Sequence, residues 1–204
     1  MIWTKRFFLS FFCLSSILLA ETIFYDDEEP ELPIIKELKH ELIPVSKTVF
    51  KVVNLETDEE KIIDLTGENF VIVSVREKGS DGRFYAVDSD GTVWWSGPVT
   101  SGAPEFRSPS GVFPIIQKKR RHMSTAFPDE SGINNMDYMM KFTRYGHALH
   151  MGSVDWMSHG CIHLDPKDVP VIYNWSTYKT KVVITRHSYM PFAKGDLRKI
   201  YLRR

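Results

Sequence analysis

The chain is poor in cysteine, carries no net charge and contains no internal repeat. Its 204 residues include two cysteines, Cys13 and Cys161, too few for the disulfide framework of a small secreted domain. Twenty-six basic residues balance 26 acidic ones, so there is no electrostatic footprint for nucleic acid and no nucleic-acid partner is expected. The remaining composition, 43% hydrophobic and 25% charged, indicates a soluble globular protein with a real core.

The N-terminus has the pattern of a secretory signal. Lys5 and Arg6 precede an apolar run, residues 7–19, that ends at Ala20. This run is shorter than the ~20 residues that a membrane-spanning helix needs, which favours a signal peptide over residues 1–20, cleaved after Ala20. An uncleaved anchor is the alternative. Both interpretations predict an exported protein of the periplasm or cell envelope, and a cleaved chain would keep Cys161 as its one thiol.

Composition divides the remaining chain into three parts. Residues 21–69 form an N-terminal extension that is acidic and proline-containing before it becomes β-like, with a short helix expected near residues 34–42. Residues 70–186 are expected to form the main domain. Residues 187–204 form a basic tail, and its part from Lys194 to Arg204 could be a short surface helix and could contact an anionic wall or membrane surface.

The main domain is predicted to be mainly β with one or two helices, an α+β arrangement. Segments 83–87 and 92–95 flank Ser89-Asp90-Gly91 and predict a hairpin. Segments 49–55 and 61–65 are expected to pair across a polar turn. Other expected elements are strands at 70–75, 112–117 and 181–185, a long loop at 118–135, and a helix from Asp165-Pro166 to about Trp175.

Four of the seven histidines lie within 17 residues around Cys161: His147, His150, His159 and His163. Nitrogen and thiolate ligands suit Zn²⁺, which usually takes four of them. The spacing argues against this site, because His147-x-x-His150 is neither a helical i, i+4 pair nor a zinc knuckle, and no Cys-x-x-Cys is present. We therefore expect neither a metal nor another cofactor.

The residues before Cys161 favour a catalytic thiol over a buried, inert cysteine. A nearby imidazole can withdraw the thiol proton and raise the reactive thiolate fraction. Gly160 allows a sharp turn or close backbone approach, where amide groups can face a developing oxyanion. Ser158 can hydrogen-bond the backbone of that turn. A cysteine that only packs in a core has no need of this polar, glycine-containing segment.

The segment Ser158-His159-Gly160-Cys161-Ile162-His163-Leu164, preceded by His150-Met151-Gly152, resembles the catalytic signature of the L,D-transpeptidase (YkuD-like) family. Further stretches are similar in the same order over roughly 100 residues: 84–102, 108–113, 139–152, Asp168 with the helix after it, and 182–185. The resemblance implies a β-sandwich or barrel-like catalytic domain.

The resemblance also implies roles for individual residues. Cys161 would be the nucleophile and His150 the general base, its ring held by a backbone carbonyl near Met151 or Gly152. The amides around Gly160 and Cys161 would form the oxyanion site. His159 would support the pocket or simply pack beside the cysteine, and His147 is expected to be structural. The expected substrate-binding residues are Ser158, His163, Met151 and Gly152.

Two features depart from the family pattern. The residue two positions after the cysteine is commonly Arg in the family, whereas here it is His163, which can be neutral or charged. This leaves the contact with the substrate's terminal carboxylate open. The spacing from His150 to Cys161 is also short, which predicts a trimmed loop over the site.

The function implied by the resemblance is acyl transfer on peptidoglycan stem peptides. The Cys161 thiolate would attack the carbonyl of a diaminopimelate-type L-centre, D-alanine would leave, and a thioester would form. An amine acceptor would then give a cross-link, whereas water would make the protein an L,D-carboxypeptidase. The alternatives are a non-enzymatic wall-binding protein and a thiol hydrolase of other amides. The oligomeric state is left open.

Overall fold

The computed structural model describes residues 38–75, 82–124, 126–128 and 134–201. The expected signal peptide and the acidic arm before residue 38 lie outside these residues. Neither of the two helices in the described part of the chain is long and apolar enough to span a membrane.

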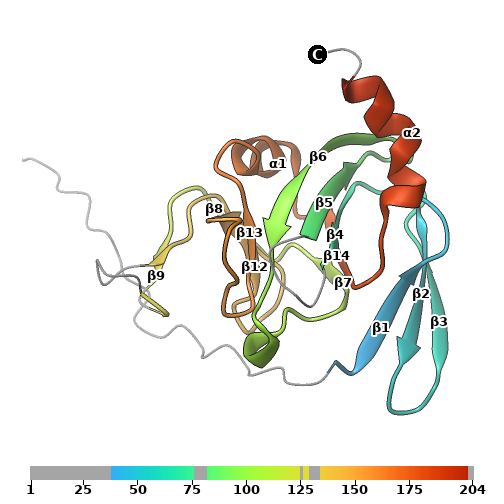
Figure 1. Ribbon diagram of the computed structural model, residues 1–204, viewed down its shortest axis with the longest axis horizontal. Coiled ribbons are helices and arrows are strands. Elements are labelled where there is room, and N and C mark those ends of the chain that lie inside the picture. The colour runs from blue at the N-terminus through green and yellow to red at the C-terminus, as the bar shows by residue number, and fades with distance from the viewer. Residues whose placement is uncertain (1–37, 76–81, 125, 129–133, 202–204) are drawn as a thin grey trace, which may run out of the picture.

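A nine-stranded mixed sheet forms the centre of the molecule (Figure 1). Only the β14–β4 and β12–β13 pairs are parallel. In spatial order the strands are β7 (Gly111–Pro114), β14 (Lys181–Thr185), β4 (Phe70–Ser74), β5 (Gly82–Val87), β6 (Val93–Thr100), β13 (Ile162–Leu164), β12 (Ala148–Met151), β11 (Met139–Lys141) and β8 (Gln117–Lys119).

The connection between β7 and β8 explains why this sheet curls. The two strands lie at opposite edges of the sheet, yet only Ile115 and Ile116 separate them in sequence. Two residues cannot cross a flat sheet of nine strands, which would be roughly 40 Å wide at ~4.8 Å per strand. The edges must therefore approach each other, and the sheet forms a half-barrel. The single strand expected at 112–117 is wrong, because the chain leaves one edge at Pro114 and joins the other at Gln117.

The sheet has an apolar core on each face. In β4, Val71 and Val73 join the core that also contains α1 (Val169–Trp175), and we call this the α1 core. Phe70 and Ile72 point the other way, into a core closed by α2 (Met190–Tyr201), which we call the α2 core. Alternation of side chains along a strand produces this division, and both faces of β4 are buried because both are covered.

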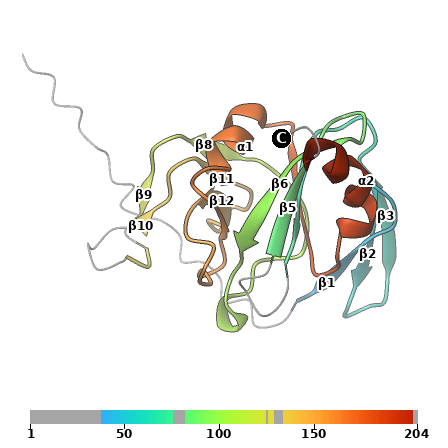
Figure 2. The same ribbon diagram turned by 45° about the horizontal axis from the view of Figure 1, so that its top comes forward.

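A small antiparallel sheet covers the α2 core together with α2 (Figure 2). It consists of β1 (His40–Pro44), β2 (Val49–Asn54) and β3 (Glu60–Asp64). The expected pairing of 49–55 with 61–65 is confirmed by β2 and β3. The helix expected near 34–42 is wrong in its described part, because His40–Leu42 lies in β1 and pairs with β2, burying Leu42. Residues 34–37 lie outside the described residues.

The basic tail is more than a surface helix. α2 begins at Met190, before the expected segment, and buries Ala193 and Leu197 against the sheet. An ion pair of 2.5 Å joins Lys47, in the turn between β1 and β2, to Asp196 of α2. The expected contact of the tail with a wall or membrane surface stays a prediction, and it would involve the exposed basic residues of α2: Lys194, Arg198 and Lys199.

Among the remaining predictions, the longer strands are confirmed and the shortest strands were not expected. The hairpin is confirmed by β5 and β6, with Gly91 at φ 77° in its turn. The loop expected at 118–135 is wrong, since it includes most of β8 and the paired strands β9 (Met123–Ser124) and β10 (Asn134–Asn135). The α1 helix ends at Trp175 as expected but begins at Val169, after a turn. The predicted fold class, mainly β with two helices, is confirmed.

Candidate active site

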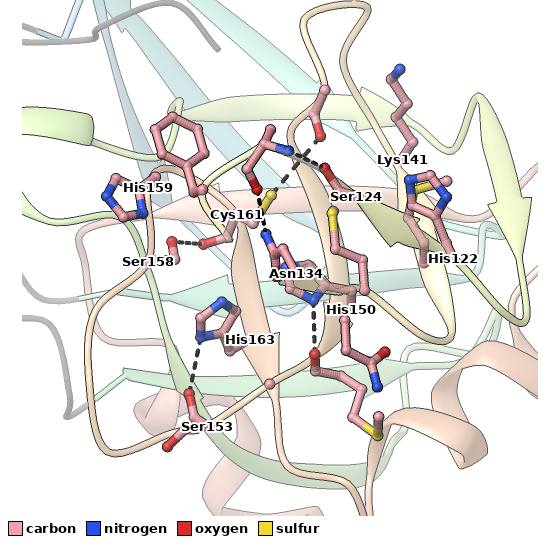
Figure 3. Close-up of a pocket in the computed structure, with 18 of the residues that line it drawn as sticks. His122, Ser124, Asn134, Lys141, His150, Ser153, Ser158, His159, Cys161 and His163 are labelled. Carbon is pink, nitrogen blue, oxygen red and sulfur yellow. Dashed lines mark hydrogen bonds between the residues drawn. The ribbon is translucent and has the colours of Figure 1, made fainter. Parts of the chain in front are cut away.

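Strand register brings the candidate residues onto one face of the sheet. Side chains of alternate residues point the same way, and the pairings of β8, β11, β12 and β13 align them in rows across the strands. One row contains Gln117, Lys141, Ala148 and Cys161, where Cys161 immediately precedes β13. The next contains Lys119, Met139, His150 and His163. A cavity of about 420 Å³ lies over this face, and every residue of the two rows except Ala148 lines it (Figure 3).

The segment before Cys161 is held by hydrogen bonds to the end of β6 and the residues after it. The Ser158 amide donates to the Ser101 carbonyl at 3.0 Å, and the Ala103 amide donates to the Ser158 carbonyl at 2.9 Å. The Ser158 hydroxyl donates to the Cys161 carbonyl at 2.5 Å and accepts from the Gly160 amide at 3.0 Å. Gly160 has φ 116°, which a residue with a side chain rarely adopts. Ser158 therefore closes the turn that presents Cys161.

Ser108 joins a third segment to this turn. Its hydroxyl accepts from the Gly102 amide at 3.0 Å and donates to the Gly160 carbonyl at 2.8 Å. Gly102 and Gly160 touch so closely that a Cβ on Gly102 would lie 2.8 Å from the Gly160 Cα. Three of the stretches that resemble the family, 84–102, 108–113 and 158–164, thus meet at the residues before Cys161.

The Cys161 side chain sits at the boundary between a small apolar cluster and the cavity. It is 7% exposed and packs with Met136, Met139 and Ala148. Its Sγ lies 3.9 Å from the carbonyl oxygen of Gly146, the contact drawn in Figure 3. Because Cys161 also lines the cavity, its sulfur is the reactive atom that a ligand there would meet.

His150 is fixed in one tautomer. Its Nδ1 lies 2.8 Å from the Met151 carbonyl, which can only accept, so Nδ1 carries the proton and the neutral ring has its lone pair on Nε2. Burial and the neighbouring His163 lower the pKa of His150 to about 3. The ring is therefore neutral near pH 7 and able to accept a proton. Of the predicted anchors, the carbonyl of Met151 is the one used.

The His163 ring packs beside the His150 ring, with the ring centroids 4.9 Å apart. Its Nδ1 lies 3.0 Å from the Ser153 carbonyl. Gly152 makes room for the ring, since a Cβ there would lie 2.6 Å from the His163 Cγ. Burial lowers the pKa of His163, which favours the neutral ring at pH 7. His163 thus brings no permanent charge to the position where the family commonly has Arg.

His159 points to the rim of the cavity rather than to the row of Cys161. It is exposed and stacks on Phe127, with ring centroids 4.1 Å apart and planes 8° apart, while Phe106 packs edge-on at 4.8 Å. Phe127 has φ 51°, an uncommon conformation for a bulky residue. Sequence reasoning missed Phe127 because it lies in the segment expected to be a structureless loop.

His147 lies beneath the turn, and its contacts support the structural role. Its Nδ1 is 2.9 Å from the Thr143 hydroxyl, and a Cβ on Gly160 would lie 3.1 Å from its Cδ2. Burial lowers the pKa of His147 to about 4. In the described part of the chain, no three His, Cys, Asp or Glu side chains form a group that could hold a metal ion.

Several lining residues carried no signal in the sequence. Lys119 and Lys141 reach the cavity from β8 and β11, His122 from the position before β9, and Asn134 from β10. Their positions depend on the pairing of short strands, which a local pattern does not reveal.

A model of the L,D-transpeptidase catalytic domain matches residues 68–184, which confirms the resemblance drawn from the motifs. A search of the curated proteins finds no match. Among solved structures, an L,D-transpeptidase from Mycobacterium smegmatis is 17% identical, with a TM-score of 0.47, over 69% of this chain and 68% of the other. One from Stackebrandtia nassauensis is 20% identical, with a TM-score of 0.47, over 57% of this chain and 55% of the other. L,D-transpeptidase 1 of Mycobacterium tuberculosis is 19% identical, with a TM-score of 0.45, over 69% and 73%.

Proposed function

Because the chain belongs to the L,D-transpeptidase catalytic-domain family, we propose that it transfers acyl groups on peptidoglycan stem peptides through a thioester on Cys161. One observation carries this assignment: Cys161 and His150 face the same cavity from adjacent strands, and His150 is held in the tautomer that accepts a proton at Nε2. A thiol and a neutral imidazole so arranged have the parts needed for nucleophilic catalysis.

In the proposed reaction, Nε2 of His150 takes the thiol proton as the Cys161 sulfur attacks the carbonyl of the L-centre that precedes D-alanine. The buried imidazolium that forms is stabilised by the negative charge developing on the sulfur and then on the carbonyl oxygen. Transfer of its proton to the departing amine releases D-alanine and leaves the thioester.

A hydrogen bond within the turn limits which backbone amides can bind the oxyanion. The Gly160 amide donates to the Ser158 hydroxyl, so a role for this amide in binding the oxyanion would require that hydrogen bond to break. We assign to Gly160 the turn itself, and to Ser158 the support of the turn. The amide of Cys161 is then the proposed backbone donor.

The proposed acceptor is an amine of a second stem peptide, which gives a cross-link. Water as the acceptor would trim the stem and make the protein an L,D-carboxypeptidase. Incubation with purified muropeptides and mass analysis distinguishes the outcomes, because dimers support transpeptidation and trimmed tripeptides support hydrolysis. Unchanged muropeptides would instead favour a non-enzymatic wall-binding protein.

The nucleophile is tested separately with a carbapenem-type acylating agent. The wild-type protein is expected to gain the mass of one adduct, and Cys161→Ala is expected to gain none. An adduct on the variant would overturn the assignment of Cys161. The assay needs no knowledge of the natural acceptor, so it tests acylation alone.

We further propose that the protein acts outside the cytoplasm, as its N-terminal signal pattern and its substrate require. Fractionation of cells followed by mass analysis of the intact protein tests this. A mature protein in the envelope fraction that begins at Glu21 is the expected result, and a full-length cytoplasmic protein would contradict it.

A further inference from the structure

The cavity around Cys161 has a one-sided charge distribution. None of the described residues that line it is Asp or Glu, whereas Lys119, Lys141 and four histidines do line it. Two of these histidines, His150 and His163, have lowered pKa values and are neutral near pH 7. The permanent positive charge of the cavity is therefore carried by lysine.

Lys141 is placed to meet a ligand that reaches Cys161. The two residues share one row across the sheet, separated only by Ala148. Two strand spacings put their Cα atoms about 10 Å apart, and both residues line the cavity, whereas Ala148 between them is fully buried. Figure 3 shows Lys141 on the side of Cys161 opposite His159.

No described residue neutralises the charge of Lys141. Lys141 is half-buried, and in the described part of the chain no carboxylate forms an ion pair with it. A lysine with a flexible stem favours an anionic ligand group when it lines a cavity whose described residues include no Asp or Glu. A stem peptide offers carboxylates of two kinds near the reacting carbonyl: the C-terminal carboxylate and that of the diamino acid side chain.

We propose that Lys141 binds a carboxylate of the donor stem peptide and so aligns the reacting carbonyl with Cys161. The inference rests on the proposed function, because it names the donor of that acyl transfer. It gives this chain a charged contact two strands away from the thiol, while the position two residues after the cysteine holds a neutral histidine.

The test pairs charge removal on the protein with charge removal on the donor. Three tetrapeptide donors are compared: the free acid, the C-terminal amide and the side-chain amide of the diamino acid. For the wild-type protein, amidation of the recognised carboxylate is expected to lower kcat/KM for donor consumption about 10-fold or more. With the free-acid donor, Lys141→Gln is expected to have a kcat/KM lower than that of the wild type by about the same factor. Amidation of the recognised carboxylate is expected to lower the kcat/KM of this variant no further. The amidated donor whose kcat/KM falls identifies the carboxylate that Lys141 binds.

Two further variants separate charge from structure. Lys141→Arg keeps the charge and is expected to keep the discrimination between acid and amide. Lys61→Gln, at an exposed position of β3, is expected to behave as wild type. If Lys141→Gln discriminates between acid and amide as strongly as the wild type does, the proposal is wrong.

A binding measurement makes the test independent of the chemistry. Cys161→Ala is titrated calorimetrically with the acid and amide donors, with and without Lys141→Gln. The proposal is supported if Cys161→Ala binds one amide donor more weakly than the free acid and if Lys141→Gln removes this difference. Equal affinities of Cys161→Ala for the acid and both amides overturn it. If the wild-type protein consumes no donor and takes up no carbapenem, the proposed function fails, while this titration still decides whether Lys141 recognises a carboxylate.

Discussion

The two halves of the central sheet are built differently. The long-strand half, β4, β5, β6 and β14, has strands of five to eight residues, and most of their side chains are fully buried on both faces. The short-strand half, β8, β11, β12 and β13, has strands of three or four residues. One face of the short-strand half packs on the α1 core, and its other face forms the cavity.

Different interactions hold the two halves together. The long-strand half relies on continuous backbone pairing and apolar burial, as in the five-residue register of β4 with β14. The short-strand half relies more on side chains that bond to backbone, among them Ser108, Ser158 and Lys118, whose Nζ reaches the carbonyls of Tyr173 and Ser176. The candidate site lies where the strands are shortest, because polar side chains there replace strand pairing and leave room for a ligand.

Replacement of His150 gives the largest effect expected in the short-strand half. His150→Ala should slow carbapenem acylation about 10²–10⁴-fold, the range for loss of a general base, because it removes the Nε2 lone pair that would take the thiol proton. Single-turnover adduct formation followed by mass analysis measures the rate. His40→Ala, at an exposed position of β1, serves as the control. An unchanged rate for His150→Ala would move the base role to another histidine.

Replacement of Ile72 tests the long-strand half. Ile72→Ala should lower the free energy of unfolding by about 2–5 kcal/mol, because it creates a cavity at a fully buried position of the α2 core. The acylation rate per folded molecule should not change. Ile62→Ala, where the side chain is 59% exposed, should change stability by less than about 1 kcal/mol. Urea unfolding measures both, and a loss of acylation in folded Ile72→Ala would break the division between the halves.

The difference in strand length between the two halves explains which strands could be predicted from the sequence. The strands expected at 70–75, 83–87 and 181–185 agree with β4, β5 and β14 within one residue, because apolar, β-branched runs are long enough to show their pattern. Strands of three residues show no period, so β8 and β11 were not identified. The connection from β7 to β8 depends on the curl of the whole sheet. No local sequence pattern indicates that two residues join opposite edges of the sheet.

The candidate site could be predicted only in part. The motif predicts Cys161 and His150 as site residues because both lie in one short segment of the chain, and the fold brings both to one cavity. Lys141 and Phe127 were not identified as site residues, because their placement depends on register and on the folding of residues 118–135. Strand β12, which carries His150, also depends on its parallel pairing with β13 for its position beside the cysteine.

Acidification should weaken the short-strand half before the rest. The pKa of His147 is lowered to about 4 and that of His150 to about 3, by burial in the folded state. Above the ordinary value near 6.5 both states are neutral, so these residues add no pH dependence there. Below it the unfolded chain binds protons that the folded chain cannot, and stability is lost as pH falls.

Between pH 6.5 and 5 the two histidines together should cost about 3 kcal/mol of unfolding free energy. Urea unfolding at several pH values measures this slope, and His147→Gln should reduce it. Hydrogen exchange should locate the loss in β11–β13, with β4 and β14 retaining protection until global unfolding. A free energy of unfolding that stays constant over this range would contradict the burial of neutral histidines.

Replacement of Ser158 gives the smallest of these effects and the sharpest test of how the turn is held. Ser158→Ala removes the hydroxyl that donates to the Cys161 carbonyl and accepts from the Gly160 amide. Since both partners are buried, the free energy of unfolding should fall by about 1–3 kcal/mol. Acylation should slow as well, because the turn that presents the sulfur loses its closure, and thermal unfolding with adduct kinetics measures both. Ser110→Ala, whose hydroxyl bonds to β14 at 3.3 Å, is the matched control. If Ser158→Ala lost stability but acylated at the wild-type rate, the polar contacts of the short-strand half would support the fold without positioning the nucleophile.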